Sequence, residues 1–95
     1  MTPTPESVLK KELKEVLKRY GAFHCMIKGG PHSKVGDPDI VVCYKGRFIG
    51  IEAKTHEGHQ STWQELRERQ ITEAGGIYAV IRSTEELIRL LEEVE

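Results

Sequence analysis

The feature that most constrains the fold is a hairpin pattern in residues 39–54. Two segments rich in β-branched and other apolar residues, DIVVCY and RFIGIEAK, are separated by the dipeptide Lys45-Gly46. A glycine-containing dipeptide between two such segments is typical of a β-hairpin turn. A symmetric two-residue turn pairs Tyr44 with Arg47 and thereby sets the register of the residues beyond them. The sequence therefore predicts two antiparallel strands in a defined register.

That register places two acids, Asp39 and Glu52, opposite each other at the open end of the hairpin. Opposed like charges destabilise an antiparallel pair, so this placement beside apolar neighbours needs a cause. Lys54 follows Glu52 by two residues and lies on the same face of the strand. One alternative is an exposed hairpin face on which Glu52 and Lys54 form a surface ion pair. A β-bulge would also shift the pairing of the two acids by one residue.

Two carboxylates in this arrangement suit a divalent cation. Mg²⁺ prefers oxygen ligands and is usually held by one or two carboxylates together with water and substrate phosphate. A neighbouring ammonium group can stabilise negative charge that develops on a phosphate. We therefore predict metal-assisted phosphodiester hydrolysis, with Asp39 and Glu52 at the metal and Lys54 beside it.

The rest of the chain predicts helices and strands around this hairpin. Thr4-Pro5 begins a helix that ends at Gly21, and a short strand follows in residues 22–28. The remaining segments are a helix over residues 61–74, a strand over residues 77–81, and a last helix that begins at Ser83. The order α-β-β-β-α-β-α predicts one α/β domain over residues 1–95, in which helices flank a mixed central sheet.

Composition excludes some classes of protein. The net charge of −1 gives no sign of a large basic surface, although a local one remains compatible with it. No apolar run approaches the roughly 18 residues of a membrane span, and the first residues resemble no signal segment, so we expect a cytoplasmic protein that binds no membrane. Cys25 and Cys43 are expected to be free thiols buried in strands.

Three segments in order resemble the VRR-NUC (virus-type replication-repair nuclease) family of the PD-(D/E)XK superfamily. They are GGPHSKVGDPDIVV, GRFIGIEAKTHEGHQSTWQ and AGGIYAVI. The resemblance implies a restriction-endonuclease-like core and an endodeoxyribonuclease that depends on Mg²⁺, for which Mn²⁺ can substitute. By size, the chain resembles the family's stand-alone phage-type domains. These are similar to homodimeric enzymes that cut Holliday junctions, so the resemblance implies a role in DNA recombination and repair. It implies no small-molecule cofactor.

The resemblance also implies roles for individual residues. Asp39, Glu52 and the backbone carbonyl of Ala53 would bind the metal, and Lys54 would be the catalytic lysine. Gln64 matches a glutamine that lies near this lysine in the family. Gln64 also completes a capping box with Ser61, so it has a structural role as an alternative, and the two roles are compatible.

An acid on the first helix often completes sites of this family. Glu6 matches that acid best by its distance from Gly21, and Glu12 is the weaker alternative. The candidates for DNA binding are Lys28, His32, Ser33, Lys34, Arg47 and His56, for which ordinary surface positions are the alternative. His56 and His59 suggest zinc, but no further ligands stand at a recognisable spacing. Trp63 is expected in the core or in a dimer contact.

Other functions remain open at this stage. The domain would cut flaps or splayed arms instead of junctions, or it would be a non-catalytic nucleic-acid-binding module that retains the fold. A hydrolase for smaller phosphate esters is a third interpretation, although the chain shows no segment that would enclose such a substrate. The complete set of Asp39, Glu52 and Lys54 favours an enzyme over a binding module.

Overall fold

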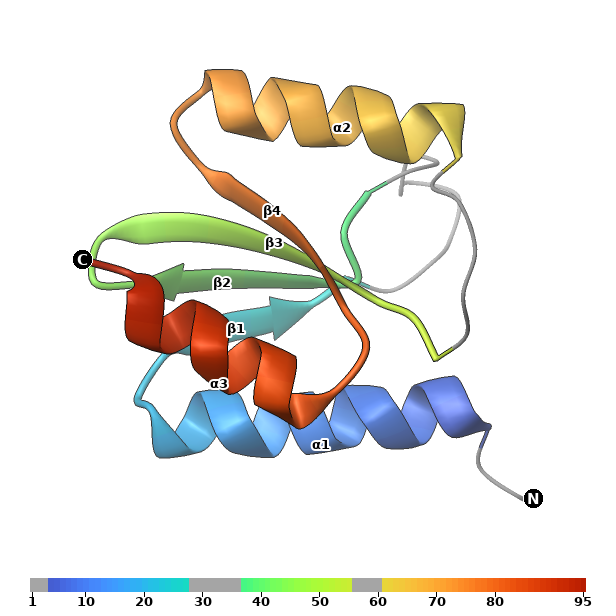
Figure 1. Ribbon diagram of the computed structural model, residues 1–95, viewed down its shortest axis with the longest axis vertical. Helices are drawn as coiled ribbons and strands as arrows, with labels where there is room; N and C mark the ends of the chain where they lie inside the picture. Colours follow the sequence, from blue (N-terminus) through green and yellow to red (C-terminus); the bar gives the residue numbers. More distant parts are fainter. Residues whose placement is uncertain (1–3, 28–36, 56–60) are drawn as a thin grey trace.

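A computed structural model describes residues 4–27, 37–55 and 61–95. The elements follow the predicted order and are α1 (Pro5–Arg19), β1 (Phe23–Met26), β2 (Ile40–Tyr44), β3 (Arg47–Ala53), α2 (Thr62–Glu73), β4 (Ile77–Ile81) and α3 (Thr84–Glu93). The four strands form one sheet in the order β1-β2-β3-β4. β2 runs antiparallel to both of its neighbours, β1 and β3, and β4 runs parallel to β3. The predicted α/β class with a mixed sheet is therefore confirmed (Figure 1).

The hairpin of β2 and β3 has the predicted turn. Lys45 and Gly46 both have positive φ angles, of 52° and 77°, as a tight two-residue hairpin turn requires. The pairs run from Tyr44 opposite Arg47 to Ile40 opposite Ile51, in the predicted register. The ladder ends there, and this leaves the acids at the open end of the hairpin.

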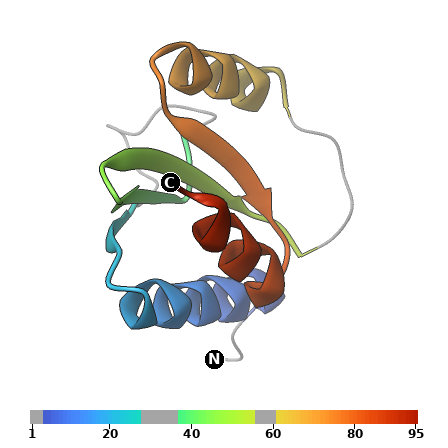
Figure 2. The same ribbon diagram turned by 60° about the vertical axis from the view of Figure 1, so that its left-hand side comes forward.

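The helices lie on both faces of the sheet. α2 covers one face, and α1 and α3 pack together on the other (Figures 1 and 2). The hydrophobic core lies between the sheet and the pair α1 and α3. Its largest fully buried side chains are Leu13, Val16, Leu17, Ile40, Val42, Ile49, Ile51, Leu87 and Leu91. α2, by contrast, contains no buried residue.

The helices begin where the sequence predicts, because a hydroxyl side chain caps each of them. Thr4 accepts a hydrogen bond from the backbone N–H of Ser7, and Ser83 accepts one from Glu86. These caps satisfy backbone donors that have no partner within the helix. At the other end of α1, Gly21 has a φ of 69°, which ends the helix as predicted.

One prediction about burial is wrong, and a second is narrowed to one of its alternatives. Cys25 and Cys43 are free thiols, but both are exposed rather than buried. They lie on β1 and β2, on the opposite face of the sheet from Ile40 and Val42. α2 instead packs against β4 and reaches β3 at Gly50. Trp63 is 53% exposed, which excludes the core alternative, and a dimer contact stays a prediction.

Among the described residues, none of the helices combines the length and the apolar character that crossing a membrane requires.

Candidate active site at the open end of the hairpin

Four elements converge at one end of the sheet. The residue before β2, the last residues of β3, the first turn of α2 and the N-terminal half of α1 all lie on the side away from the hairpin turn (Figure 1). The predicted catalytic residues come from the first three of these elements.

Asp39 is held by both neighbouring strands and by its own side chain. Its backbone carbonyl accepts from Ile27 N at 2.8 Å, and its backbone N–H donates to Ile51 O at 2.8 Å. Its Oδ2 accepts from the backbone N–H of Ala53 at 2.9 Å. The carboxylate thus takes the place of a backbone acceptor where the ladder ends. Oδ1 instead lies 3.5 Å from the ammonium nitrogen of Lys10 on α1.

Glu52 is in a different environment from Asp39. Glu52 is 8% exposed. Among the residues that the structure describes, it is the one charged residue that is buried. Within that part, its Oε2 is buried without a hydrogen-bond partner. Burial raises the pKa of Glu52 from 4.5 to about 7, reinforced by the charge of Asp39 and by a side-chain hydrogen bond to it, and opposed by the charge of Lys54. A buried oxygen without a partner next to a second carboxylate is a place where a cation would be stabilised.

Lys54 and Gln64 contact each other through their side chains. The backbone N–H of Lys54 donates to Ile81 O in β4 at 3.1 Å, and this hydrogen bond fixes the position of the Lys54 backbone. The ammonium of Lys54 donates to Gln64 Oε1 at 3.3 Å. The same oxygen accepts from Ser61 N at 3.0 Å, and Ser61 Oγ accepts from Gln64 N at 3.1 Å. The capping box and the contact with Lys54 therefore exist together.

These residues offer the oxygen donors that a hard divalent cation prefers. Asp39 and Glu52 contribute carboxylates, and Ala53 places a backbone carbonyl between Glu52 and Lys54. Among the described residues, no group of three or more His, Cys, Asp and Glu side chains gathers at one point. Two carboxylates are a donor set that fits Mg²⁺, which usually keeps several waters beside one or two carboxylates.

A solved structure described as "VRR_NUC domain" superposes on the chain with a TM-score of 0.74. The two sequences are 24% identical, and the match covers 98% of this chain and 100% of the other. The chain has the VRR_NUC fold. No family model and no curated protein matches the sequence.

The first helix of this chain, α1, contributes a residue that the sequence did not indicate. Lys10 contacts Asp39, and its side chain is 31% exposed. Glu6 is exposed one helical turn earlier on the same side of α1 as Lys10, whereas Glu12 is exposed about 200° around the helix. Of the two acids considered for this helix, Glu6 is thus the one on the side that faces Asp39.

An ion pair links the segment before Asp39 to α2. Arg67 Nε lies 3.0 Å from Asp37 Oδ1, and the guanidinium also donates to Gln70 Oε1. Asp37 stands two residues before Asp39, and Arg67 stands one turn after Gln64. The pair therefore connects α2, which carries Gln64, to the segment that carries Asp39.

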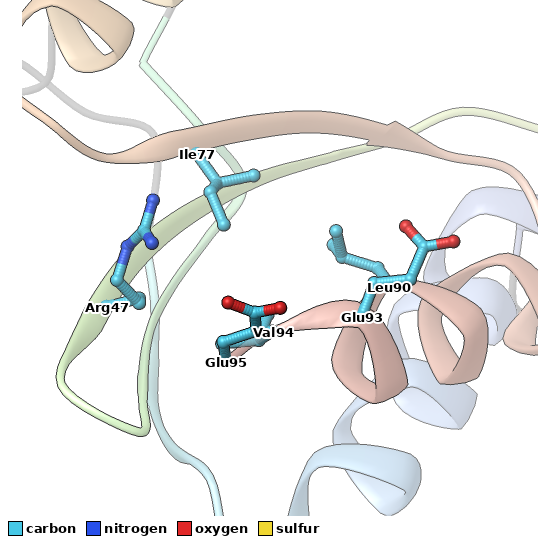
Figure 3. A pocket seen from close by; sticks show the side chains of 6 residues that line it. All are labelled: Arg47, Ile77, Leu90, Glu93, Val94 and Glu95. Atoms are coloured by element: carbon cyan, nitrogen blue, oxygen red, sulfur yellow. The ribbon is translucent and has the colours of Figure 1, made fainter.

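Most of the DNA-binding candidates lie outside the described residues, namely Lys28, His32, Ser33, Lys34 and His56, as does His59. Arg47 is described and lies at the start of β3, at the opposite end of the strand from Glu52. There it lines a cavity of about 280 Å³ with residues from β4 and the C-terminal segment: Ile77, Leu90, Glu93, Val94 and Glu95 (Figure 3). The structure thus does not bring Arg47 to the carboxylate site.

Proposed function

We propose that the protein is a metal-dependent endonuclease of the PD-(D/E)XK type that hydrolyses phosphodiester bonds in DNA. The observation that carries the proposal is the buried, unpartnered Oε2 of Glu52 next to Asp39. The VRR_NUC fold and the contact between Lys54 and Gln64 support it.

Each residue has a task that follows from its surroundings. Asp39 and Glu52, with the backbone carbonyl of Ala53, would hold Mg²⁺ or Mn²⁺. When bound, such a metal lowers the pKa of a water and polarises a phosphoryl oxygen. Lys54 presents an ammonium that offsets charge developing on the phosphate. Gln64 fixes the direction of that ammonium, and the helix cap in turn fixes Gln64.

For the substrate, we propose branched DNA, and most specifically a Holliday junction cut by a homodimer. Two copies related by a two-fold axis would present one site to each of two strands. A row of exposed residues across three strands supports a second copy: Phe23, Cys43 and Phe48 are paired in register on one face of the sheet. Phe23 and Phe48 remain 67% and 42% exposed, which is unusual for side chains of this size.

The cleavage experiment compares an immobile four-way junction with a matched duplex, a splayed arm and a 5′ flap. We expect symmetric nicks on the junction with Mg²⁺ or Mn²⁺ and none with chelator. Glu52→Gln should slow cleavage roughly 1,000-fold or more, because the metal loses a ligand. Glu15→Gln, an exposed acid on α1, is the matched control and should cut normally. Cleavage by Glu52→Gln at the wild-type rate would refute the active site.

The other outcomes separate the remaining functions. Cleavage of flaps or splayed arms alone keeps the nuclease and rejects the junction. Metal-independent binding without cleavage supports the non-catalytic binding module instead. Sedimentation tests the dimer independently. Wild-type protein should sediment as a dimer, and the Phe48→Ser variant should shift towards monomer. A monomeric wild-type protein would refute the dimer.

A further inference from the structure

The two side-chain oxygens of Asp39 do different things. Oδ2 accepts the backbone N–H of Ala53 at 2.9 Å and so belongs to the architecture of the sheet. Oδ1 lies 3.5 Å from Lys10 Nζ. Oδ1 is therefore the oxygen that contacts a charged side chain rather than the backbone.

Lys10 reaches this oxygen from outside the strands. It stands on α1, next to the buried Leu9, so its side chain leaves the helix at the border of the core. The side chains of Lys10 and Asp39 are 31% and 21% exposed, which keeps water near the pair. The positive charge of Lys10 also acts on Glu52, although it is the smallest of the effects on that carboxyl group.

We propose that Lys10 is a built-in counter-ion of the metal site, which neutralises Asp39 when no metal is bound and competes with a divalent cation for Oδ1. This inference rests on the proposed function, because it needs the carboxylate pair to bind a metal. A cation at the pair meets the repulsion of a neighbouring ammonium and has to replace it at Oδ1. Lys10 thus weakens metal binding in the absence of DNA.

The test measures Mn²⁺ affinity of the full chain by calorimetry without DNA. Lys10→Met should bind Mn²⁺ roughly 3- to 10-fold more tightly than wild type, because it removes both the competitor and its charge. Lys10→Arg keeps the charge and should stay near the wild-type affinity. Lys18→Met removes an equal charge about 12 Å further along α1 and should change the affinity less than about twofold.

The result overturns the inference if Lys10→Met binds Mn²⁺ as wild type does or more weakly, or if Lys18→Met tightens binding as much. Lys10→Gln, which retains polarity, repeats the test if the methionine variant fails to fold. The two proposals fail in different ways. Wild-type protein that binds no Mn²⁺ refutes the proposed metal site itself. Binding that disappears in Glu52→Gln but is unchanged in Lys10→Met keeps the metal site and rejects the role of Lys10.

Discussion

The two faces of the sheet differ in the helices that cover them. Several side chains of α1 and α3 are completely buried against the first face, whereas no residue of α2 is buried on the second. On the first face, Leu13, Leu17, Leu87 and Leu91 have no exposed surface. On the second, α2 has no buried residue. This second face instead contains Glu52, a buried charge whose Oε2 has no partner among the described residues.

The difference separates what stabilises the fold from what forms the site. α2 is held by a few specific contacts rather than by a core. One such contact is at Gly50 of β3, where an added Cβ would lie 3.2 Å from Ile71 Cδ1 of α2. The ion pair of Arg67 and Asp37 adds a second contact. The helix that carries Gln64 therefore depends on individual interactions, each of which a mutation can test.

The largest expected effect on stability belongs to the α1 face. Leu13→Ala should lower the free energy of unfolding by about 3 kcal/mol, because it leaves a cavity in a fully buried position. Ile71→Ala on α2 should lower it by about 1 kcal/mol, because that side chain is only partly buried. Urea unfolding of both variants measures the difference. Equal losses would show that α2 contributes to the core as much as α1 does.

The next effect is a pH dependence that belongs to Glu52. Its pKa in the folded protein, about 7, lies above its ordinary value of 4.5. The folded protein therefore keeps a proton on Glu52 that the unfolded chain releases. The contribution of this protonated carboxyl to the free energy of unfolding is complete below pH 4.5 and is lost as the pH rises through 7. Without metal, wild-type stability should fall by about 2 kcal/mol more between pH 5 and pH 8 than that of Glu52→Gln.

Urea unfolding at the two pH values in the presence of chelator makes this measurement. Glu15→Gln replaces an exposed acid and should keep the wild-type dependence. The same slope in wild type and Glu52→Gln would mean that the buried carboxyl is not responsible. At pH 5, where the Glu52 carboxyl keeps its proton, Asp39→Asn should lower stability, because it weakens the hydrogen bond from Ala53.

Local chemistry made one part of the site predictable from sequence. Lys45-Gly46 and the alternation around it specify the hairpin register, and that register places Asp39 and Glu52 at the open end. Serine and threonine caps likewise gave the helix starts. These features depend on neighbours in the chain, so a single sequence contains them. The capping role of Gln64 was predictable for the same reason.

The remaining features depend on how the elements pack, which the sequence pattern does not state. α1 has lysines at positions 10, 11, 14 and 18, and helical spacing alone does not indicate which of them reaches Asp39. The alternation of β1 and β2 predicts two faces, but not that α2 packs over the other two strands and leaves Cys25 and Cys43 exposed. Trp63 is a related case, since apolar spacing on α2 is compatible with either a core position or a dimer contact, and its 53% exposure excludes only the first.

The smallest expected effect on stability tests whether the α2 contacts serve the site. Arg67→Met removes the ion pair with Asp37, which should lower the free energy of unfolding by less than about 1 kcal/mol because the pair is partly exposed. Cleavage should nevertheless fall roughly 10-fold, since α2 loses a contact that positions Gln64 relative to Asp39. Arg69→Met removes an exposed charge from the same helix and should leave both quantities unchanged. A stability loss without a cleavage defect would mean that Gln64 is positioned by its cap and Lys54 alone.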